Sequence, residues 1–81
     1  MTPVIFRKFG NRVVIALFPT IKTGNKNFIQ DYIHVGQHGE ADYSFVISKT
    51  RLATPEEYKE LLNELVGIGY ANLKVYKRFK A

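Results

Sequence analysis

The strongest constraint on the fold is a single well-marked helix start at Thr54-Pro55-Glu56-Glu57. The threonine suits an N-cap, the proline suits the first helical position, and the second glutamate completes a capping box. Apolar residues then recur along one face at helical spacing, namely Tyr58, Leu61, Leu62, Leu65 and Val66. Gly67 or Gly69 can end the helix in a left-handed conformation. We therefore predict one amphipathic helix, which must bury its apolar stripe against a sheet.

The N-terminal residues predict a β-hairpin. Two apolar runs, Val4–Phe9 and Arg12–Phe18, flank the dipeptide Gly10-Asn11. A two-residue loop needs positive φ angles, which Gly and Asn adopt readily. This loop length would place Phe6 opposite Ile15. The second run is apolar on both faces, so we expect its strand to lie in the interior of the sheet.

Three more strands complete the predicted sheet. Pro19 should end the second strand, because proline has no amide to donate. Phe28–Val35 and Tyr43–Lys49 read as the third and fourth strands, and Leu73–Phe79 reads as the last. The fourth strand, the helix and the last strand would form a right-handed crossover between parallel strands.

The predicted order is thus ββββαβ, in a single α+β domain that covers residues 1–81. Its two layers would be one helix and a four- to five-stranded, mainly antiparallel sheet. A helix about 10 Å wide cannot cover such a sheet completely. We therefore expect the opposite sheet face to be solvated, curled or bound to a partner.

Composition excludes several classes of protein. The chain has no cysteine, so disulfides, thiolate chemistry and cysteine-bound zinc are ruled out, and a reducing, cytoplasmic location is expected. The longest apolar run, Val13–Phe18, is far shorter than the roughly 20 residues of a membrane span, so no membrane association is expected. The net charge is +5, with basic residues gathered toward both ends of the chain.

The segment His34–Asp42 is the main candidate for a functional loop. It holds both histidines and two of the six glycines, between two predicted strands. With the strand residue before it, it supplies the first group of candidate binding residues, which are Tyr32, His34, Gly36, Gln37, His38, Gly39 and Asp42.

Four interpretations of this segment stay open. His34, His38 and Asp42 recur every four residues and are metal-ligating types. The histidines could instead act as acid or base near neutral pH. The glycines could let successive amides bind an oxyanion or a nucleotide phosphate. Finally, the segment could have a purely structural role, in which the glycines supply positive φ angles and the histidines form hydrogen bonds to loop carbonyls. Because the segment matches no catalytic or metal motif, we predict no enzymatic activity and no cofactor.

A second group of candidate binding residues lies near the C-terminus, at Tyr76, Lys77 and Arg78. Basic side chains can contact phosphates and a tyrosine can stack on a base, so nucleic-acid binding is an alternative function. No motif that reads nucleic-acid sequence accompanies them, and the predicted helix is acidic.

Two blocks of the sequence resemble a known pattern. Tyr32–Gly39 is followed by Ala41-Asp42-Tyr43, and Ala53–Tyr58 is followed later by Gly69-Tyr70. Together they are similar to a family of small bacterial proteins, also associated with phages and plasmids, that has no assigned activity. The resemblance implies a bacterial or phage protein of the cytosol and implies nothing about catalysis.

These observations favour a small, non-catalytic interaction protein. We expect it to form a homodimer or to bind a protein partner. The contact surface would be the uncovered sheet face together with the segment His34–Asp42.

Overall fold

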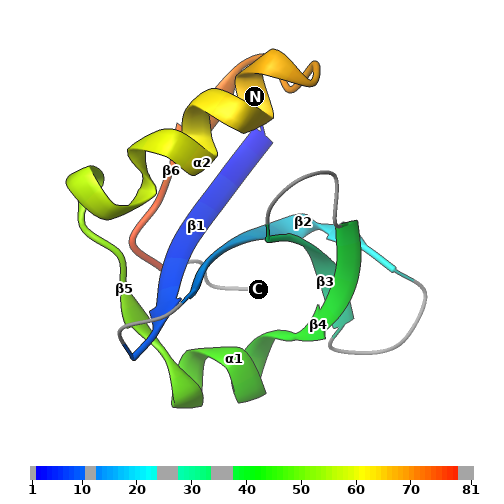
Figure 1. Cartoon of the computed structure of the whole chain (residues 1–81). Helices are drawn as coiled ribbons and strands as arrows, with labels where there is room; N and C mark the ends of the chain where they lie inside the picture. The colour runs from blue at the N-terminus through cyan, green and yellow to red at the C-terminus, as the bar shows by residue number, and fades with distance from the viewer. Residues whose placement is uncertain (1, 11–12, 24–27, 34–37, 79–81) are drawn as a thin grey trace.

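The structure, a computed structural model, describes residues 2–10, 13–23, 28–33 and 38–78 (Figure 1). Its elements are β1 (Thr2–Phe9), β2 (Val13–Lys22), β3 (Phe28–Tyr32), β4 (His38–Asp42), α1 (Tyr43–Lys49), β5 (Arg51–Leu52), α2 (Pro55–Gly67) and β6 (Leu73–Val75). The α+β class and the mainly antiparallel sheet are confirmed. The sheet has six strands and the order is ββββαβαβ with two helices, so the predicted single helix, four- to five-stranded sheet and order ββββαβ are matched only in part.

Strand β1 organises the sheet. The strand order is β4-β3-β2-β1-β5, with every neighbour antiparallel, and β6 pairs with β1 in parallel. The Phe6 carbonyl accepts from Ala53 N–H at 3.0 Å, and the Val4 carbonyl accepts from Tyr76 N–H at 2.8 Å. Because carbonyls two residues apart on a strand point to the same side, β5 and β6 lie end to end along one edge of β1. The expected crossover between parallel strands was wrong: its predicted first strand, Tyr43–Lys49, is a helix, and β5 and β6, the strands on either side of α2, run antiparallel and parallel to β1.

The first hairpin has a longer loop than the sequence predicts. Phe9 pairs with Val13 and Phe6 with Ala16, so three residues rather than two connect the strands. Gly10 adopts φ +52°, which agrees with the need for a left-handed residue in the loop. The Phe6–Ile15 pairing was therefore wrong by one residue.

Strand β2 is interior to the sheet, as predicted, but it does not end at Pro19. Its register to β3 shifts between Phe18 and Lys22, where three extra residues are accommodated. Proline is tolerated at such an irregularity, because the ladder is already interrupted there.

The fourth strand and the following helix differ most from expectation. β4 lies inside the segment predicted to be a loop, and Tyr43–Lys49 is the helix α1 rather than a strand. Asp42 caps this helix, because its Oδ1 accepts from the Phe45 amide at 3.1 Å. β3 ends at Tyr32 rather than Val35, and β6 ends at Val75 rather than Phe79. Residues 34–37 and 79 of the predicted segments lie outside the described residues.

Helix α2 begins and ends as predicted. The Glu57 amide donates to Thr54 Oγ1 at 3.3 Å, and the Thr54 amide donates to Glu57 Oε1 at 2.9 Å. This pair of bonds is the capping box. At the other end Gly69 adopts φ +117° and donates to the Val66 carbonyl, while the Tyr70 amide reaches the Leu65 carbonyl at 3.1 Å. The helix thus ends in a Schellman motif.

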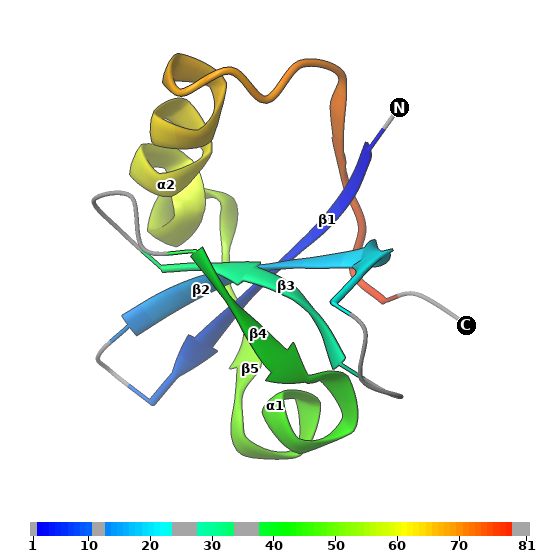
Figure 2. The same cartoon turned by 90° about the vertical axis from the view of Figure 1, so that its right-hand side faces the viewer.

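Both faces of the sheet are buried. α2 covers one cluster, formed by Val4, Phe6, Ala16, Phe18, Tyr32, Ala53, Leu61 and Leu65. α1 covers the other, formed by Ile5, Ile15, Leu17, Ile29, Ala41 and Val46. Figure 2 shows the two helices on opposite sides of the sheet. The expectation of an uncovered sheet face is therefore corrected, because the second helix was missed.

Of the helices in the described ranges, none is long and apolar enough to cross a membrane.

Candidate interaction site at the β4 edge

Strand β4 forms one border of the sheet. Its inner edge pairs with β3 from Tyr32–His38 to Phe28–Asp42. Within the part of the chain that the structure describes, no strand pairs with its outer edge. The opposite border consists of β5 and β6, which are only two and three residues long. β4, with five residues, is therefore the longest edge available for pairing with another chain.

His38, at the start of β4, is held against the segment that follows α2. Its Nε2 is hydrogen-bonded to the Tyr70 hydroxyl at 2.9 Å, and Gln30 Nε2 donates to the same hydroxyl at 2.7 Å. The His38 ring meets the buried Tyr32 ring edge-on, with centroids 4.7 Å apart. Tyr70 in turn stacks on Phe18, and burial raises the pKa of its hydroxyl. His38 is thus exposed but oriented by its contacts with two neighbours, Tyr70 and Tyr32.

Tyr32 was predicted as a binding residue, but its side chain is fully buried. Its hydroxyl donates to the Glu64 carboxylate of α2. This bond satisfies the hydroxyl, the only polar group of the buried Tyr32 side chain, and it joins β3 to α2. Tyr32 is therefore a core residue that contacts His38, and its side chain is not exposed to a partner.

Gly39 has a packing role. Its Cα lies over the Asp31 side chain, which is only 8% exposed. A Cβ at position 39 would stand 2.9 Å from Asp31 Oδ1. Burial raises the pKa of Asp31, whereas a hydrogen bond from the Gly39 amide and the nearby His38 partly lower it. The glycine thus permits a close approach of the β4 backbone to a buried carboxyl.

The structure does not assemble the predicted metal ligands. His38 and Asp42 lie at opposite ends of β4, and four steps along a strand span about 13 Å. Asp42 is also engaged as the cap of α1. The described ranges contain no group of three side chains able to hold a metal ion. His34, Gly36 and Gln37 lie outside the described residues.

The second group of candidate residues lies at the other border of the sheet. Tyr76 is half-buried against the second cluster, with Lys74 Nζ 5.6 Å from its ring centroid. Lys77 and Arg78 are exposed. These residues follow β6, and three strands separate β6 from β4 in the sheet order. The two predicted groups therefore do not form one surface.

Two basic residues of β1 are engaged within the protein. Arg7 donates to the Thr50 carbonyl at 2.6 Å, to Thr50 Oγ1 at 2.9 Å and to the Ile47 carbonyl at 3.2 Å. It therefore binds the carbonyl end of α1, and burial lowers its pKa. Lys8 pairs with Glu57 of α2 at 2.9 Å. These two charges add little to any basic patch for nucleic acid.

The site also depends on residues that the sequence did not single out. Gln30 lies on β3, Glu64 on α2 and Tyr70 after α2. Only in the fold does Glu64 bond to Tyr32, and Tyr70 to His38 and Gln30. No local pattern marks such contacts, because their partners lie 32 to 40 residues away in the chain.

No protein-family model matches this chain, and neither curated proteins nor solved structures show significant similarity to it.

Proposed function

We propose that this protein is a non-catalytic interaction module that pairs the outer edge of β4 with a strand of a second protein chain. That chain is either another copy of the protein or a different partner. The proposal rests on one observation, which is the five-residue edge strand without a pairing strand on its outer side among the described residues. Added strands bind mainly through backbone hydrogen bonds, and side chains then select the partner.

Two features of β4 support this role. The strand has neither proline nor lysine, two residues that commonly protect edges from pairing, although it carries the charged Glu40 and Asp42. It is also held in register by five residue pairs with β3. A strand that is already extended loses less conformational entropy when a partner binds.

The charged residues of β4 have opposite effects on pairing with another copy and on pairing with a different, cationic partner. If two copies pair antiparallel about Glu40, His38 faces Asp42, and the two Glu40 residues face each other. The first pairing is favourable, whereas like charges directly opposite are unfavourable. A partner strand with a cation opposite Glu40 would avoid that penalty. Glu40→Gln should therefore strengthen self-association and weaken binding of a cationic partner strand.

Hydrogen exchange tests the proposal. Amides of residues 38–42 that point away from β3 should exchange rapidly in the dilute protein and slowly when a second chain is bound. The measurement is made on purified protein over a range of concentrations and on protein in clarified cell extract. Residues 73–75 of β6 serve as an internal control. If residues 38–42 show no added protection under either condition, the proposal fails.

A further inference from the structure

The acidic residues of this basic protein are segregated. All seven lie in three segments, β3, β4 and α2, and they are Asp31, Glu40, Asp42, Glu56, Glu57, Glu60 and Glu64. β1, β2 and β6 contain basic residues and no acid. Helix α2 carries four of the seven, Glu56, Glu57, Glu60 and Glu64, so it concentrates negative charge in a protein with a net charge of +5 and favours a positively charged partner beside it.

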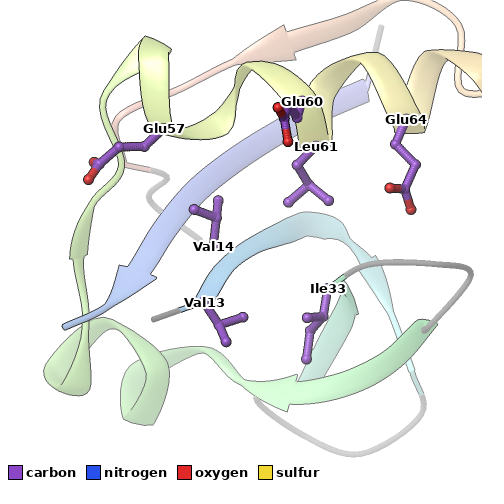
Figure 3. Close-up of a pocket in the computed structure, with 7 residues that line it drawn as sticks. All are labelled: Val13, Val14, Ile33, Glu57, Glu60, Leu61 and Glu64. Atoms are coloured by element: carbon purple, nitrogen blue, oxygen red, sulfur yellow. The ribbon is translucent and has the colours of Figure 1, made fainter. Parts of the chain in front are cut away.

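A groove opens beside the glutamates of α2, between this helix and the sheet. Its volume is about 460 Å³, within the range of about 300–1,000 Å³ found for ligand pockets. The apolar lining comes from β2, the end of β3 and the buried face of α2, and consists of Val13, Val14, Ile33 and Leu61. Figure 3 shows Leu61 and Glu64 pointing from α2 toward the sheet, on the side where Val14 of β2 and Ile33, which follows β3, lie.

Three carboxylates line the helix side of the groove at intervals of three and four residues. Glu57 lies at one end and is held by Lys8 and Arg51 at 2.9 and 2.6 Å. Glu64 lies at the other end and accepts from the Tyr32 hydroxyl. Glu60 lies between them and has no ion pair with any described residue. An apolar lining beside carboxylates at helical spacing complements a chain in which cations flank an apolar side chain.

We propose that this groove binds a basic peptide segment of a partner protein. An apolar side chain of the segment packs against Val13, Val14, Ile33 and Leu61. Lysine or arginine side chains on either side of it pair with Glu60 and Glu64. The groove is lined by α2 and β2 rather than by the β4 edge, so the inference is independent of the proposed strand pairing.

Residue-resolved NMR tests this assignment on the full chain at low salt. The probe is the amidated peptide Lys-Val-Tyr-Lys-Arg, and Glu-Val-Tyr-Glu-Glu is its matched control. The basic probe should shift the resonances of Val13, Val14, Ile33 and Leu61 and leave residues 38–42 unchanged. Its affinity should fall as salt rises, because exposed charge pairs are screened.

A pair of helix variants separates the groove from general electrostatics. Glu60→Lys should weaken binding of the basic probe roughly five- to tenfold, the effect expected for reversing a charge in an exposed pair. Glu56→Lys makes the same change of charge on the same helix but outside the groove lining, so it should have a much smaller effect. Both residues are exposed, so both variants should keep the wild-type fold, which the spectrum of each variant checks directly.

Three outcomes would overturn the inference. The first is equal loss of binding in Glu56→Lys and Glu60→Lys. The second is binding of the acidic control, or shifts confined to residues outside the groove. The third is a set of groove shifts that grows with protein concentration alone, which would make a second copy the occupant. Protection of residues 38–42 is measured separately, so a failure here leaves the strand-pairing proposal to its own test.

Discussion

Gly39 approaches Asp31 so closely that a Cβ on the glycine would stand 2.9 Å from the aspartate Oδ1. Gly39→Ala should therefore force the β4 backbone or the buried carboxyl to move. We expect a loss of about 1–3 kcal/mol in the free energy of unfolding, as for other overpacked sites. Urea denaturation measures this loss.

A double-mutant cycle ties that loss to the Asp31 side chain. In an Asp31→Ala background the clashing oxygen is gone, so Gly39→Ala should cost clearly less than in the wild type. Equal costs in the two backgrounds would show that the carboxyl is not what the new methyl group meets.

The buried Asp31 should give stability a distinctive pH dependence. Burial raises its pKa in the folded state above the ordinary value, so the folded protein retains a proton that the unfolded chain has released. The contribution of Asp31 to stability should therefore fall as pH rises through this window. Asp31→Asn removes the titration and can still accept from the Gly39 amide.

The measurement is the wild-type minus Asp31→Asn difference in unfolding free energy, followed from about pH 3 to about pH 7. We expect this difference to decrease with rising pH. An increase would mean that the pKa of Asp31 is lowered in the folded protein, contrary to its burial.

The capping box should contribute measurably to α2. Thr54→Ala removes the hydroxyl that accepts from the Glu57 amide, and we expect a loss of about 1 kcal/mol in unfolding free energy. Thr54→Ser keeps that acceptor and should lose much less. If serine and alanine are equally destabilising, the methyl group of the threonine matters more than its hydroxyl.

Arg7 should secure α1 to the sheet. Its guanidinium donates hydrogen bonds to two carbonyls at the end of the helix. A neutral glutamine amide cannot reproduce the charge and the planar arrangement of donors of the guanidinium. Arg7→Gln should lower the unfolding free energy by roughly 1.5–3 kcal/mol. Hydrogen exchange of residues 43–49 should accelerate more than that of α2. Lys59→Gln, an exposed change on α2, is the control and should leave both helices unaffected.

The sequence predicted α2 in detail because its signals are local. The cap, the apolar stripe and the closing glycine all lie within Thr54–Gly69, and each acts on its own neighbours. Most of the stripe is buried or half-buried as expected, but Val66 is 58% exposed. The helix contacts the sheet along a narrower face than the sequence pattern indicates.

The prediction that Tyr43–Lys49 is a strand was wrong because a short apolar run fits the spacing of a strand and that of a helix. Tyr43, Phe45 and Ile47 alternate as in a strand, while Tyr43, Val46 and Ile47 also follow helical spacing. Asp42 was the available signal, since an aspartate before such a run suits an N-cap. Because this helix was not predicted, the prediction left one sheet face uncovered and placed the start of the fourth strand five residues too late in the chain.

The pairing of β6 with β1 has a consequence for synthesis of the chain. Residues 2–4 pair with residues 73–75, so β1 acquires this neighbour only after residue 75 has been translated. Until then the N-terminal half of β1 is an open edge on a nascent chain, exposed to chaperones and to other nascent chains. The step that completes the sheet is also the one that closes the longest loop, which should make it a late event in folding.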